Sequence, residues 1–126
     1  MRTQSQLKAE IYNTLLNDTI LTNDIYWLGR PTVSNAFPLI TYSSVDTFAD
    51  YNFCGKSSEV VQFQLDLYVD PSAMAVMETQ YEQIKIVMEG LDYRLMSSPA
   101  EFLEETLNKI IRVTRWEIIN VTLIIL

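Results

Sequence analysis

The ionisable and nucleophilic side chains of this 126-residue sequence offer few routes to catalysis. Histidine is absent, and it is the side chain that most often moves protons near neutral pH and activates Ser or Cys nucleophiles. The single cysteine, Cys54, precedes Gly55 on a predicted loop, where no motif would activate the thiol. Three glycines, at positions 29, 55 and 90, are too few for a phosphate-binding loop or a dinucleotide fingerprint. We therefore expect no enzyme and no cofactor.

Carboxylates are the remaining groups that could carry chemistry. Glu59, Asp66 and Asp70 could in principle surround Ca²⁺ or Mg²⁺, but their spacing matches no known calcium-binding loop. A carboxylate pair for glycoside hydrolysis can come from distant parts of a chain, so the sequence leaves that alternative open. Glu104 and Glu105 are more typical of a solvated helix face. We expect no metal-binding residues.

The charge distribution favours protein contacts over nucleic-acid binding. Sixteen acidic and nine basic residues give a net charge of -7, which disfavours tight binding to phosphate backbones. The acidic excess lies between Asp46 and Glu105, whereas Lys109, Arg112 and Arg115 cluster near the C-terminal end. Such asymmetry suits head-to-tail contact between copies of the chain. A uniformly solvated acidic surface is the alternative.

Length and hydrophobicity predict one domain over residues 1–126, and the cysteine count and the N-terminal sequence predict that it is made in a cytoplasm. One cysteine leaves no internal disulfide, and the polar segment Met1–Glu10 does not resemble a signal peptide. The apolar segment Val121–Leu126 is much shorter than the ~20 residues that a membrane-spanning helix needs. We expect no membrane association.

The clearest element is a strand over residues 59–70, in which every second residue is apolar (Val61, Phe63, Leu65, Leu67 and Val69). The residues between them are largely polar, so this strand should have one apolar face and one wet face. Further patterns predict helices over 5–16, 71–89 and 98–107, and strands over 24–29, 39–45, 92–97 and 109–118. Extended structure is the rival for 98–107, and residues 47–58 form either a protruding finger or a strand extension that turns at Gly55.

Three local signals mark helix ends. Asp70 followed by Pro71 is typical of a helix start, and Gly90 stands where a left-handed cap would close the long helix. Ser98 and Glu101 match a capping box that would open the third helix. The order of elements predicts an α+β fold, an antiparallel β-sheet with a long and a shorter α-helix packed on one face.

Several side chains are candidates for contact between subunits. Tyr51 and Phe53 are large groups on an arm that should be exposed, although they could also fold back onto the body. The uncharged C-terminal segment would be an aggregation hazard if left on an open edge, so either the domain's own core or a neighbouring copy should cover it. The candidate contact residues are Tyr51, Phe53, Lys56, Arg112, Arg115, Leu123, Ile124 and Leu126.

The chain resembles the tail-completion and tail-terminator proteins of long-tailed bacteriophages over about Leu7 to Ile118. Pro38–Tyr42 opens the first main strand, Phe63–Tyr68 lies in the second, and a long helix follows Asp70 directly. The segment Leu103–Glu105 followed by Lys109–Trp116 is similar to the last strand region of that family. The segment after Ile118 is where this chain departs from the pattern.

The resemblance implies a structural protein without catalytic residues, located in the virion tail or neck. Its implied partners are copies of itself in a hexameric ring, together with tail-tube and neck proteins. An acidic ring lumen would let DNA pass without sticking, because like charges repel. A head-completion protein, a tube subunit and an acidic inhibitor that mimics DNA are the alternatives.

Overall fold

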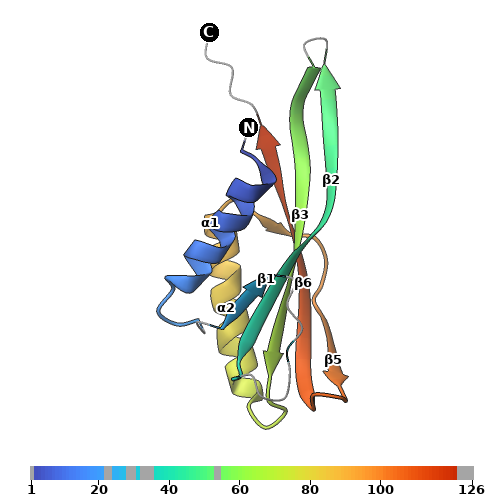
Figure 1. Ribbon diagram of the computed structural model, residues 1–126. Helices are drawn as coiled ribbons and strands as arrows, with labels where there is room; N and C mark the ends of the chain where they lie inside the picture. The colour runs from blue at the N-terminus through green and yellow to red at the C-terminus, as the bar shows by residue number, and fades with distance from the viewer. Residues whose placement is uncertain (1, 22–23, 28–30, 32–35, 53–54, 122–126) are drawn as a thin grey trace.

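The computed structural model describes residues 2–21, 24–27, 31, 36–52 and 55–121. Two helices cover one face of a six-stranded sheet, which is the α+β arrangement that the sequence predicts (Figure 1). The elements are α1 (Gln4–Leu16), β1 (Ile25–Trp27), β2 (Leu39–Asn52), β3 (Gly55–Val69), α2 (Met74–Gly90), β4 (Arg94–Leu95), β5 (Ala100–Glu104) and β6 (Lys109–Val121). The sheet order is β1-β2-β3-β6-β4, and β5 pairs with β6 as well.

The central strand β3 carries the alternation that the sequence predicts. Its apolar residues from Val61 to Val69 are at most 2% exposed and face the helices. The opposite face is less wet than expected, because Gln62 is only 8% exposed and Asp66 is half-buried. The low exposure of these polar side chains has a simple cause, because strands β2 and β6 flank β3 along nearly its whole length.

One strand pair departs from the antiparallel expectation. β1 pairs in parallel with β2, with Ile25 opposite Ile40 and Trp27 opposite Tyr42. The Ile40 amide donates to the Asp24 carbonyl (2.9 Å), which is the ladder bond of the first pair, Ile25 with Ile40. The other strand pairs are antiparallel.

The β2–β3 hairpin settles the prediction for residues 47–58 as a strand extension. The two strands stay paired out to Asn52 and Gly55, with register shifts after Ser44 and after Asp50. This distal part forms a ribbon that projects beyond both helices (Figure 1). The ribbon is therefore a continuation of strands β2 and β3. It also protrudes, as the alternative prediction of a finger requires (Figure 1).

The two helices begin and end partly as expected. At the start of α1, the Thr3 hydroxyl accepts a bond from the Gln6 amide while the Gln6 side chain accepts one from the Thr3 amide. α2 begins at Met74, so the prediction of a start at Asp70 and Pro71 is wrong by one turn. The Asp70 carbonyl instead accepts the Ala73 amide in a separate turn.

The predicted left-handed cap at Gly90 is also wrong. Gly90 is the last residue of α2 itself, and the left-handed residue is Asp92, with a φ of 71°. The Tyr93 amide then bonds to the Met88 carbonyl at 2.9 Å, which turns the chain back toward the sheet. Asp tolerates this backbone conformation better than most residues, so the turn needs no glycine.

The predicted helix over 98–107 is wrong, and its rival is correct. Residues 100–104 form β5, which pairs with β6 from Lys109 to Val113 around a turn with Asn108 at a φ of 52°. The capping-box pattern is overridden because this edge of β6 needs partners for its backbone groups. The ladder between β5 and β6 supplies these partners, and a helix over 98–107 would not.

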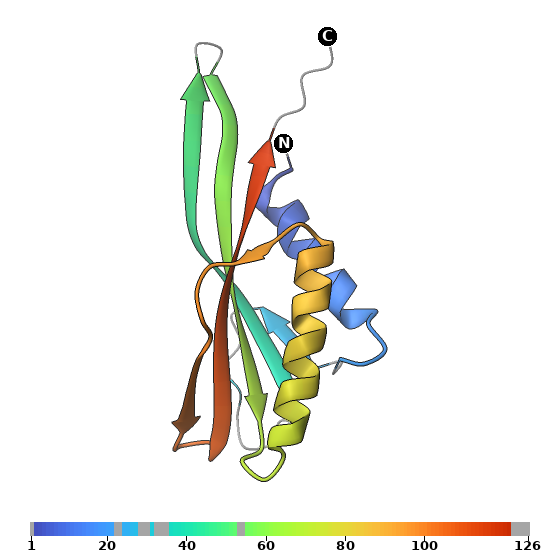
Figure 2. The ribbon, with the colours of Figure 1, turned by 180° about the vertical axis from the view of Figure 1, so that it is seen from behind.

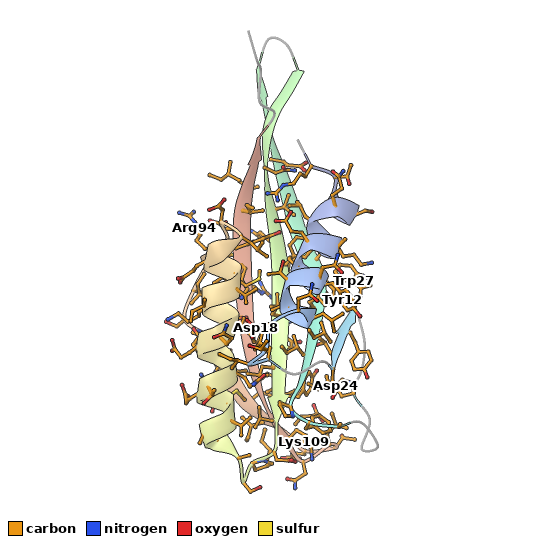
Figure 3. The ribbon with its side chains drawn as sticks, turned by 90° about the vertical axis from the view of Figure 1, so that its left-hand side faces the viewer. Tyr12, Asp18, Asp24, Trp27, Arg94 and Lys109 are labelled. Carbon is orange, nitrogen blue, oxygen red and sulfur yellow. The ribbon has the colours of Figure 1, made fainter. Side chains whose placement is uncertain are left out.

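The core lies between the helices and the sheet. Leu7, Ile11 and Leu15 of α1 are fully buried, as are Met77 and Met88 of α2. Trp116 is the largest fully buried side chain, and its indole donates to the Thr114 hydroxyl at 2.8 Å. Tyr12 and Trp27 lie together at the α1 side of the sheet, where both rings contact Tyr42 (Figure 3).

Candidate assembly surface

The face of the sheet that the helices leave uncovered carries a polar network at its centre. Arg115 donates to the Gln64 side-chain oxygen at 3.2 Å, and Gln64 donates in turn to the Asp66 carboxylate at 3.0 Å. Burial raises the pKa of Asp66, while the bond from Gln64 and the charge of Arg115 oppose that rise. Arg115 is exposed and Asp66 is half-buried, so this network presents its cation to solvent.

An ion pair on the same face likewise has its cation as the more exposed partner. Arg94 of β4 lies directly opposite Glu117 of β6, and its guanidinium bonds to that carboxylate. The Arg94 side chain is 79% exposed and the Glu117 side chain only 14%. Figure 3 places Arg94 at the margin of the molecule beside the upper end of α2. The cation is therefore again the outward partner.

The helix side carries an ion-pair cluster of opposite polarity. Arg112 of β6 bonds through Nη2 to Glu78 of α2 (2.5 Å) and to Glu101 of β5 (2.7 Å), and it stacks on the Tyr81 ring. Here the arginine side chain is 12% exposed and Glu78 is 61% exposed. The hydrogen bond from Arg112 lowers the pKa of Glu78, and the bond to Glu78 raises that of Arg112.

The candidate contact residues fall into three groups. Tyr51 and Lys56 lie opposite each other in the β2–β3 ladder near the tip of the ribbon. Arg115 is exposed on the uncovered face of the sheet, whereas Arg112 is engaged within its own chain. Phe53, Leu123, Ile124 and Leu126 lie outside the described residues. Contact of these residues with a neighbouring copy stays a prediction.

Exposed apolar side chains mark surface that the sequence analysis missed. Ile119 of β6 is 65% exposed and Ile86 of α2 is 62% exposed, the two highest values among the described large apolar residues. Phe102 and Leu103 of β5 are about half exposed. A signal existed for Ile86, because it lies off the apolar stripe of its helix. None existed for Ile119, because β6 is apolar on both faces and its orientation depends on the register with β3.

Buried polar groups join the two ends of the chain. Asn120 bonds to the Arg2 backbone and to the Glu59 carboxylate (2.9 Å), which ties the start of α1 to the end of β6. The Tyr93 hydroxyl is buried without a hydrogen-bond partner in the described part of the chain, and burial raises its pKa. These contacts stabilise the joint between helix and sheet.

The described residues hold no cluster of potential metal ligands. No three acidic or cysteine side chains among them gather where they could hold a metal ion. A cleft of about 340 Å³ at the lower end of the sheet is lined by Pro31, Tyr68, Glu104, Thr106, Leu107 and Ile111, with Glu104 its one carboxylate. In the part of the chain that the structure describes, neither helix is long and apolar enough to cross a membrane.

Comparison with known proteins identifies the fold. No protein-family model and no curated protein matches the sequence. Among solved structures, the chain is similar to a chain from the "Virion of native gene transfer agent (GTA) particle", with a TM-score of 0.72 and 16% sequence identity. The match covers 91% of this chain and 93% of that one. This chain therefore has the fold of a protein from that particle over almost its whole length.

Proposed function

We propose that this chain is a structural protein of a phage or prophage virion, a tail terminator that forms a ring, caps the tail tube and joins it to the head. The observation that carries the proposal is the near-complete fold match to a chain of a gene transfer agent virion. The resemblance of the sequence to tail-completion proteins points to the same class, and it supplies the more specific role.

The surface supports a role in assembly. Its exposed features are ion pairs and single large apolar side chains, and both kinds of group contribute to protein interfaces. A ring forms when one surface of a subunit binds a different surface of the next and the rotation closes. The net charge of -7 would keep a ring lumen from holding passing DNA.

The projecting ribbon suits contact with a further component. Beyond Ser44 the edge of β2 that faces away from β3 has no partner strand among the described residues. An unpaired edge can accept a strand from another protein. Tyr51 and Lys56 lie on this ribbon and remain the proposed contact residues there, with a neighbouring copy or a tail protein as the partner.

Electron microscopy of the purified chain, alone and mixed with tail tubes that lack their terminator, tests the proposal. We expect closed rings of about six copies, the number implied by the family resemblance, bound at one end of each tube. Binding along the sides of the tubes would indicate a tube component instead. Binding to phage heads, with the ends of the tubes left unoccupied, would indicate a head-completion protein. Either result would contradict the terminator role.

A further inference from the structure

The outer surface of α2 carries two acids followed by an apolar residue. Glu78, Glu82 and Ile86 are spaced four residues apart, so they form one stripe along the helix. Their side chains are about equally exposed: 61% for each glutamate and 62% for the isoleucine residue. We call these three residues the helix stripe.

The uncovered face of the sheet carries two arginines followed by an apolar residue. Arg115 and Ile119 of β6 point to the side opposite the buried Trp116 and Ile118, and Arg94 lies level with Glu117 between them. Arg94 is 79% exposed, Ile119 is 65% exposed, and Arg115 is exposed. We call Arg115, Arg94 and Ile119 the sheet stripe.

The two stripes match in order, charge and spacing. Eight residues of helix separate Glu78 from Ile86, about 12 Å at the helical rise. Four residues of strand separate Arg115 from Ile119, about 14 Å. In each stripe the middle charge lies roughly halfway. α2 and β6 also run in the same direction in one molecule (Figure 2), so the two stripes can meet in parallel. Glu78 bonds to Arg112, which precedes Arg115 by three strand residues or about 10 Å, so the rotation axis between neighbours must be tilted from that direction to align the stripes.

We propose that the helix stripe of one copy binds the sheet stripe of the next copy. Glu78 faces Arg115, Glu82 faces Arg94, and Ile86 packs on Ile119. The charge complementarity is built into each subunit, because the helix side hides its arginine and shows its carboxylates while the sheet side does the reverse. The two stripes lie on opposite sides of the molecule, so the contact is head-to-tail and can propagate into a ring. This inference rests on the proposed function and names the surfaces that would close its ring.

Two single variants and their mixture test the contact. Ile86→Asp destroys the helix stripe and leaves the sheet stripe intact, whereas Ile119→Asp does the opposite. Each variant alone should associate on the order of tenfold more weakly than the wild-type chain, or worse, by light scattering. An equimolar mixture, with one variant isotopically labelled, should give a heterodimer in native mass spectrometry, because one intact contact is available per pair. Ile20→Asp, at a residue 52% exposed outside both stripes, is the matched control.

The outcomes separate this inference from the proposed function. If both variants fold, as circular dichroism and thermal melting report, and assemble like the wild type, the stripe contact is wrong while the ring stands. Variants that stay monomeric alone and also in the mixture would show that the contact is not head-to-tail, which overturns the pairing. A wild-type chain that is monomeric at high concentration would overturn both the stripe contact and the self-assembled ring.

Discussion

Phe63 occupies the centre of the buried face of β3 and is 1% exposed. Its ring lies edge-on to Trp27 of β1 (6.4 Å between ring centres) and to Tyr93 (6.0 Å), just before β4. Edge-to-face pairs of this kind stabilise a core beyond the burial of apolar area. One residue therefore links the central strand to the two margins of the sheet.

We expect Phe63→Ala to lower the free energy of unfolding by about 3 to 5 kcal/mol, because it removes buried apolar area and leaves a cavity. Urea denaturation followed by tryptophan fluorescence measures the change. Ser44→Ala is the control, since Ser44 lies directly opposite Phe63 in β2 but is exposed. A loss below about 1 kcal/mol for Phe63→Ala would mean that this face of β3 does not hold the core.

At the scale of elements, two helices and five strands could be predicted from the sequence where the signal is local. The alternation in β3 needs only its own residues, and the stripe Met77, Tyr81, Ile84 and Met88 of α2 likewise identifies its buried face. The sequence predicts β5 only as the alternative to a helix, because its extended conformation depends on the free edge of β6 rather than on its own pattern. The start of α2 was missed because the Asp70–Pro71 signal was used by a preceding turn.

The candidate assembly surface also has features that the local sequence predicts and features that depend on tertiary contacts. Exposure of Arg115 can be expected from its charge alone, but the engagement of Arg112 depends on Glu78 and Glu101, which lie far from each other in the sequence. The orientation of Ile119 depends on the β3–β6 register, which neither strand specifies alone. Which charged and apolar side chains are exposed together therefore depends on contacts between elements that are distant in the sequence.

Arg112 is the one side chain that joins α2, β5 and β6 through bonds to charged partners in the described structure. Arg112→Met keeps much of the stem that stacks on Tyr81 and removes those bonds. We expect faster amide hydrogen exchange in residues 100–104, because β5 buries little apolar area that could hold it in place. Arg94→Met, which breaks one exposed pair, should leave β5 unchanged. Unaltered exchange in β5 after Arg112→Met would show that its ladder with β6 suffices.

At the scale of the whole molecule, the arrangement of charge matters more than its total. The net charge of -7 by itself predicts mutual repulsion between copies. The structure nonetheless places exposed arginines on one side of the sheet and exposed glutamates on the other, so a neighbour approached in the head-to-tail orientation meets opposite charge. Two like sides brought together repel. The local charges therefore favour the head-to-tail arrangement of copies, which is the arrangement that can close a ring.

A charge exchange within one chain tests this relation directly. Glu82→Lys and Arg94→Glu should each weaken self-association several-fold, because each places like charges across every contact between copies. The chain that carries both changes should regain much of the lost association, since every contact in a ring of identical copies then holds the pair in reversed order. Sedimentation velocity at low and high salt measures the three variants, and added salt should reduce the differences between them. A double variant that is weaker than both single variants would mean that Glu82 and Arg94 do not face each other across the contact.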